Sequence, residues 1–114
     1  MRFAVRVLKL ADALPNKASG RTISNQIARS GCSVAANYRA ALRGKSRADF
    51  INKITTVLEE ADETSFWIDL TIQSGLLPEQ RLKTLQAEAE ELTKIFNATR
   101  TTARNKSQII NHKS

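Results

Sequence analysis

The densest group of side chains able to do chemistry is the carboxylate run at residues 59–63, EEADE. On a helix, Glu59 shares one face with Glu63 and with Asp62, because residues three and four apart are neighbours there. Helix bundles hold two metal ions with such carboxylates, but those sites also take a Glu-x-x-His pair from each of two helices. The single histidine is His112, near the end of the chain. We therefore interpret the run as a solvated or ion-paired face. The alternatives are a metal site and pairing with arginines at an interface.

Residue types used in nucleophilic and phosphate-binding chemistry are present without their partners. Cys32 has no histidine near it, and Ser30 and Ser33 have no nearby base. The segment GRTISNQ, residues 20–26, lacks the Gly-Lys-Ser/Thr of a phosphate-binding loop. We predict a protein that is not an enzyme, with no catalytic residues, no metal and no cofactor. Cys32 is expected to be a small packed residue, and as the only cysteine it fits a reducing cytoplasm.

A cluster of cations is the remaining signal for function. Arg29 and Arg43 are fourteen residues apart, nearly in phase on a helix, and Arg39 lies one turn before Arg43. Lys45 and Arg47 extend the cluster across the following turn. These five residues are the candidates for binding RNA or DNA. The alternative is a solvated basic face that pairs with the carboxylate run, within or between subunits.

Charge is distributed unevenly along the 114 residues, which carry a net +7. Residues 1–45 hold nine Lys/Arg and one acid, a net +8, whereas residues 46–77 are net −4 and residues 78–114 net +3. A basic half either faces a polyanion or pairs with the acidic segment. The length of 114 residues fits one domain that can bury a core, and the apolar fraction of 41% predicts that this basic protein folds.

No segment reads as a membrane span or a signal peptide. A span needs about 18 consecutive apolar residues, and none approaches that length. The first residues, MRFAVRVLKLADALP, are basic and then apolar, but Arg6, Lys9 and Asp12 interrupt the apolar run. We predict a cytoplasmic protein with no membrane partner.

Apolar residues recur three and four apart through most of the chain, which predicts an all-α fold. The predicted helices span about residues 2–14, 22–43, 47–74 and 78–103, with 104–114 as a polar C-terminal tail. Ser46 and Asp49 have capping-box spacing, and Gly75 is expected to stop the third helix. Short loops favour antiparallel neighbours in a four-helix bundle.

The second predicted helix has an unusually thin middle, within QIARSGCSVAANYRAALRG. Gly31 and Ala35 are therefore candidates for close helix packing. Tyr38 and Trp67 are candidate core or interface anchors. The first helix is much shorter than the others and cannot cover the whole groove between them. We expect the uncovered part to be buried against another subunit.

The combination of FAVRVLKLADALP, QIARSGCSVAANYRAA, SRADFINKI and EEADETSFWIDL resembles the bacterial four-helix-bundle family of 23S rRNA intervening-sequence proteins, over about residues 3–103. The resemblance implies a four-helix bundle that assembles into a ring, commonly a homopentamer, without an established enzyme activity. The chain is also similar to accessory proteins of diversity-generating retroelements. That similarity implies work with a reverse transcriptase and nucleic acid.

The chain departs from the family pattern in two places. Ala40 stands where many relatives have Glu, shortly after the Asn that aligns with Asn37. The chain also begins directly at the first helix, which is compatible with a shortened start. The functional hypothesis is a non-enzymatic, oligomeric helical bundle with a candidate nucleic-acid-binding or accessory role. The alternative is a purely structural or protein-interaction oligomer that binds no nucleic acid.

Overall fold

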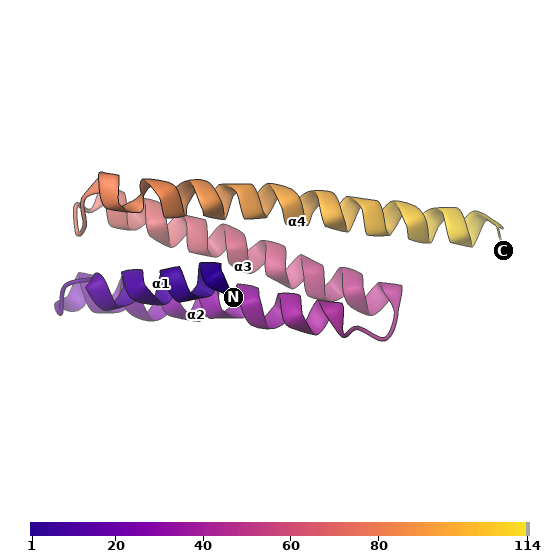
Figure 1. Cartoon of the computed structure of the whole chain (residues 1–114), viewed down its shortest axis with the longest axis horizontal. Helices are drawn as coiled ribbons and strands as arrows, with labels where there is room; N and C mark the ends of the chain where they lie inside the picture. The colour runs from indigo at the N-terminus through magenta and orange to yellow at the C-terminus, as the bar shows by residue number, and fades with distance from the viewer. Residues whose placement is uncertain (114) are drawn as a thin grey trace.

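In the computed structural model, which describes the backbone of residues 1–113 and the side chains of residues 1–106, the chain forms four α-helices and no strand. The helices are α1 (Arg2–Ala13), α2 (Ala18–Leu42), α3 (Arg47–Gln73) and α4 (Glu79–Lys113). Consecutive helices run antiparallel along an elongated molecule of 57 × 21 × 21 Å (Figure 1). The predicted all-α fold with four helices and a short first helix is confirmed.

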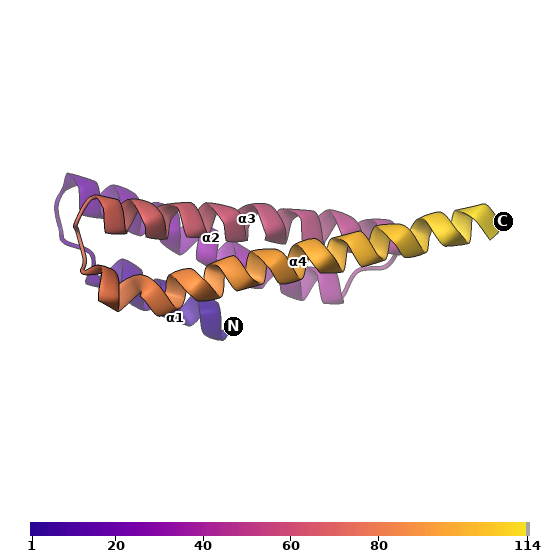
Figure 2. The same ribbon diagram turned by 90° about the horizontal axis from the view of Figure 1, so that it is seen from above.

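Each helix packs against two neighbours. α1 and α3 each contact both α2 and α4, so α1 and α3 lie diagonally across the bundle (Figure 2). The predicted apolar stripes face inward, and Val7, Ile27, Ile54 and Ile68 are fully buried. Burying each of these side chains stabilises the fold by about 1.5–3 kcal/mol before the entropy of ordering is subtracted. Among the described residues, no helix combines the length and apolarity that crossing a membrane requires.

Two predicted helix boundaries are wrong. α2 begins at Ala18 rather than at residue 22, and Gly20, whose neighbours have the composition of a loop, lies within its first turn. A Cβ at Gly20 would lie 1.9 Å from the Pro15 carbonyl oxygen, so the glycine lets the preceding loop cross the helix start. α4 continues to Lys113 rather than ending at 103. No Gly or Pro follows Gly75 in the sequence except Pro78, so nothing stops the helix.

The ends of α3 follow their predicted chemistry. The Asp49 backbone N–H donates to the Ser46 hydroxyl oxygen at 3.1 Å, which caps the helix N-terminus. At the other end Gly75 has φ +70°, a left-handed conformation that glycine adopts without a Cβ penalty. These caps fix where α3 starts and ends, and so place its side chains against α2 and α4.

α1 covers only part of the groove between α2 and α4. Its N-terminus lies near the middle of the long axis, well short of the turn between α2 and α3 (Figure 1). Just past that point, Tyr38 of α2 and Phe96 of α4 pack with ring centroids 5.6 Å apart. The groove therefore continues without a fourth helix toward the far end of the bundle.

Candidate nucleic-acid interface

Antiparallel packing gathers cations from three helices at one end of the molecule. The last turns of α2, the α2–α3 turn and the distal part of α4 share this end (Figure 1). Of the predicted candidates, Arg39, Arg43, Lys45 and Arg47 are there, all exposed. None of these four forms an ion pair with another described residue.

α4 adds two exposed cations that sequence reasoning missed, Arg104 and Lys106. Both residues belong to segment 104–114, for which the sequence predicts a polar tail. They would have been identified by extending the fourth predicted helix beyond Phe96. We name Arg39, Arg43, Lys45, Arg47, Arg104 and Lys106 the basic end. Asp49 is the one acidic residue in segments 36–53 and 95–106, which supply this end of the bundle.

Arg100 lies beside the basic end but is half-buried. One of its terminal nitrogens donates to the Asn97 side-chain oxygen at 3.3 Å, while its Nε is buried without a hydrogen-bond partner. The side chain is thus held against the bundle, and its charge adds to the potential at this end.

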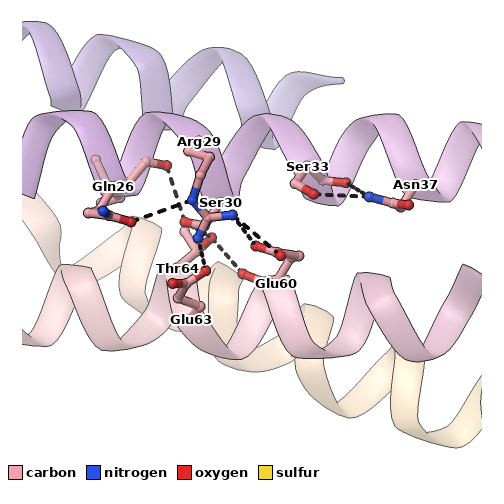
Figure 3. A network of polar contacts seen from close by, with 9 residues as sticks. Gln26, Arg29, Ser30, Ser33, Asn37, Glu60, Glu63 and Thr64 are labelled. Atoms are coloured by element: carbon pink, nitrogen blue, oxygen red, sulfur yellow. Dashed lines mark hydrogen bonds and ion pairs between the residues drawn. The ribbon is translucent and has the colours of Figure 1, made fainter.

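Arg29, the fifth predicted candidate, is separated from the others. It lies fourteen residues before Arg43 on α2, about 21 Å along the helix. Its guanidinium forms ion pairs with Glu63 and with Glu60, the latter at 3.2 Å, both on α3 (Figure 3). Gln26 also accepts a hydrogen bond from its Nε at 3.4 Å. For Arg29, the interpretation as an ion-paired residue fits better than that of a phosphate ligand.

The two glutamates that pair with Arg29 have pKa values displaced in opposite directions. Burial raises the pKa of Glu60, and a hydrogen bond shared with Glu63 raises it further, against the opposing charge of Arg29. Burial also acts to raise the pKa of Glu63, but hydrogen bonds from Arg29 and Glu60 and the Arg29 charge outweigh it and lower the pKa. Folding therefore favours the ionised form of Glu63 and disfavours that of Glu60.

This difference predicts opposite effects for two matched substitutions. Because its pKa is lowered on folding, Glu63 contributes stability that is fully present above the ordinary glutamate pKa of 4.5 and is lost as pH falls through the folded-state value. Glu63→Gln should thus lower the free energy of unfolding at neutral pH by no more than about 1 kcal/mol for so exposed a pair, seen as a lower melting temperature, and have little effect once the pH is below the folded-state pKa of Glu63.

Glu60→Gln serves as the control. The folded state holds the proton of Glu60 more tightly than the unfolded state does, so ionisation at neutral pH weakens stability. We expect this variant to be neutral or slightly more stable at neutral pH. Equal loss of melting temperature in both variants, measured by circular dichroism, would contradict the assignment.

The rest of the carboxylate run points away from α2. Glu59 and Asp62 are exposed on α3, and neither pairs with another described residue. Among the described residues, no three His, Cys, Asp or Glu side chains come close enough to ligate one ion. His112 lies outside the described side chains. The run is thus split between an internal ion pair and an exposed acidic face.

Small polar side chains bridge α2 and α3 next to Arg29. Ser30 and Thr64 are fully buried, with their hydroxyl oxygens 2.8 Å apart (Figure 3). The Thr64 oxygen is also 2.8 Å from the Glu60 carbonyl, and its single proton donates to one acceptor at a time. These hydroxyls satisfy buried polar groups. Cys32 is exposed, so the prediction that it is a small packed residue is wrong: it falls on the outer side of α2, whose inner side holds Ser30.

The four packing candidates occupy different environments. Gly31 is buried against α1, and a Cβ there would lie 2.5 Å from Val7 Cγ1. Ala35 is half-buried and, with Tyr38, lines the groove at the N-terminus of α1. Trp67 is half-buried against the core, with its indole nitrogen buried and without a hydrogen-bond partner. Gly31 thus serves helix packing, whereas Ala35 and Tyr38 border the uncovered groove.

Comparisons with known proteins agree with the fold. A family model described as 23S rRNA-intervening sequence protein matches residues 1–98. The chain is also similar to a crystal structure of a protein of unknown function from the S23 ribosomal protein family of Bacteroides thetaiotaomicron VPI-5482. The two are 37% identical, the match covers 86% of this chain and 91% of that one, and the TM-score is 0.80. No curated protein matches the chain.

Proposed function

The chain belongs to the 23S rRNA-intervening sequence protein family, and from that premise we propose a non-enzymatic, cytoplasmic bundle protein that assembles with copies of itself and binds nucleic acid. The basic end is the proposed binding surface. The single observation that carries this proposal is the convergence of six exposed cations from α2, the α2–α3 turn, α3 and α4 on one end, beside a single carboxylate.

Such a surface suits phosphates better than bases. Exposed Lys and Arg side chains bind the regularly spaced phosphates of either RNA or DNA and release condensed counterions. Sequence would be read by side chains that reach base edges or stack on bases, and the basic end consists of cations alone. We therefore propose binding with little sequence preference and a steep dependence on salt.

Assembly would multiply the contacts. The groove left open beyond α1 supports burial against another subunit, and the resemblance stated above makes a homopentameric ring the proposed stoichiometry. Several basic ends in one particle would turn weak single contacts into avidity wherever one strand reaches more than one of them. The same resemblance makes a reverse transcriptase a candidate partner.

Two measurements on the parent protein test the proposal. Light scattering should give a mass of about five times 12.7 kDa at micromolar concentration. Fluorescence anisotropy with labelled RNA and DNA should show binding at about 50 mM salt. The affinity should fall by at least severalfold when the salt is raised to about 200 mM. A monomer would refute the assembly, and no binding to either polymer at low salt would refute the nucleic-acid role.

The second candidate is a structural or protein-interaction oligomer that binds no nucleic acid. Arg29 favours it, because this arginine is neutralised inside the subunit by Glu60 and Glu63. If the remaining arginines are neutralised likewise by acidic residues of neighbouring subunits, the assembly would form without affinity for polyanions. An oligomer that does not bind either polymer would establish this alternative.

A further inference from the structure

The groove beyond α1 is an apolar surface with a basic rim. Its larger part has a volume of about 730 Å³ and an adjoining part about 270 Å³, and Ile95 lines both. The larger part is lined by Phe50 of α3 and by Ala98 and Ala103 of α4. Arg47 and Lys106 also line it and supply its positive charge. We name this surface the distal groove. The adjoining part reaches the N-terminus of α1, where Phe3 and Ala4 line it.

A second exposed apolar surface lies on α3. Phe66 is 54% exposed and Leu70 is also exposed, one turn further along the same face. Glu59 and Asp62 share this face, because the spacing 59, 62, 66 and 70 follows the helical repeat. Neither carboxylate pairs with another described residue, in contrast to Glu60 and Glu63. We name Glu59, Asp62, Phe66 and Leu70 the acidic face.

We propose that the distal groove of one subunit receives the acidic face of α3 from a second copy of the chain. Phe66 would then enter the apolar groove, and Glu59 and Asp62 would approach the cations of its rim. This inference rests on the assembly part of the proposed function and names the surfaces that carry it.

Charge selects this pairing among the exposed apolar surfaces of the described chain. Two distal grooves facing each other would bring Arg47 and Lys106 against their own copies, which costs free energy. The exposed apolar residues of α1, Val5 and Leu8, stand between Arg2 and Lys9 and would also meet a basic rim. The acidic face of α3 carries two exposed carboxylates beside its apolar residues, whereas Leu8 has the single carboxylate of Asp12 one turn away, next to Lys9.

The two surfaces are different, so the contact is head-to-tail. The distal groove is lined by the first turn of α3 and the distal part of α4, whereas the acidic face lies further along α3, at residues 59–70. Contacts of this kind build rings when the rotation per subunit closes, and open chains when it does not. The pairing also divides the basic end: Arg47 and Lys106 would serve assembly, whereas Arg39, Arg43 and Lys45 would remain for phosphates.

Complementary single substitutions test the pairing. Phe66→Asp spoils the acidic face and leaves the groove intact, while Ile95→Asp places a charge in the groove and leaves the acidic face intact. Phe66 and Ile95 are 54% and 47% exposed, so both variants should keep the parent's helicity. Alone, each should have a mass of about 12.7 kDa. Mixed in equal amounts, they should form a species of about twice 12.7 kDa and no larger.

The matched control is Leu8→Asp, on the outer face of α1, where the side chain is 41% exposed. It should keep the parent mass. Two folded variants that both retain the parent mass, or two monomers that do not combine on mixing, would overturn the pairing while the proposed function stands. A monomeric parent would overturn the assembly itself, and the pairing with it. Anisotropy of the monomeric variants with labelled RNA reports separately whether Arg39 and Arg43 bind phosphate.

Discussion

A chain carrying Arg39→Glu and Arg43→Glu should bind labelled RNA and DNA on the order of 100-fold more weakly than the parent at low salt. Each substitution removes one charged hydrogen bond to phosphate, worth about 1.5–3 kcal/mol when made, and adds repulsion. The salt dependence should also become shallower, by about one unit of slope for each phosphate that is no longer neutralised. Anisotropy titrations at several salt concentrations measure both effects.

The fold should survive this change. Arg39 is exposed on α2 and Arg43 is exposed directly after the end of that helix, and neither pairs with another described residue. Helicity and oligomeric mass should therefore equal those of the parent, and both are checked before binding is measured. A smaller mass would show that the arginines serve an interface between subunits.

A matched variant separates position from total charge. Lys17→Glu with Lys83→Glu alters net charge by the same amount at the opposite end of the bundle, where both lysines are exposed. We expect this variant to lose much less affinity than the variant at the basic end. Equal losses would mean that nucleic acid senses only the overall charge of +7, and the basic end would have no special role.

The helical architecture was predictable because the seams are regular. Val7 of α1, Ile27 of α2 and Ile54 and Ile68 of α3 each belong to the apolar stripe predicted for their own helix, and all four are buried as the stripes require. The start of α2 was not predictable, because Gly20 within PNKASGR has the composition of a loop. Only the crossing of Pro15 over the helix explains why glycine is present there.

The basic cluster was only partly predictable from the sequence. Spacing along one helix shows which residues share a face, but not which side chains of another helix lie opposite them. Arg29 and Arg43 are nearly in phase, yet Arg29 reaches Glu60 and Glu63 across the α2–α3 contact. At Arg43, one end of the bundle has been reached, and α4 supplies Arg104 and Lys106 instead of acids. Whether an arginine of α2 meets a carboxylate of α3 depends on which residues of the two antiparallel helices lie side by side. That register is set by the packing of the whole bundle.

The carboxylate run shows the same limit at a finer scale. Sequence spacing placed Glu59 and Glu63 on one face, but Glu63 turns toward Arg29 on α2 while Glu59 stays exposed. Two residues on one face of a helix can therefore have different surroundings, because a neighbouring helix contacts only one edge of that face. The division leaves one pair of carboxylates to hold the subunit together and another for contacts outside it.

Gly31→Leu should destabilise the bundle by about 1–3 kcal/mol, the usual range for overpacking a close contact. A Cβ at this position would already lie 2.5 Å from Val7 Cγ1, and Val7 is fully buried. The added side chain must push α1 away from α2, and the apolar residues of α1 would lose part of their burial. Urea denaturation followed by circular dichroism measures the destabilisation. Ala36→Leu, on the exposed side of α2, is the control and should change stability little.

A double-substitution cycle at the same contact separates steric crowding from a general loss of helix packing. Val7→Ala alone removes buried methyl groups and should cost about 1–2 kcal/mol. Gly31→Ala alone gains helix propensity, about 1 kcal/mol, but introduces the clash. In the double variant, the shorter side chain at position 7 leaves room for the new Cβ, so the chain should be more stable than the sum of the single effects predicts. Strict additivity would show that α1 and α2 do not approach closely at Gly31, and the thin middle of α2 would then need another explanation.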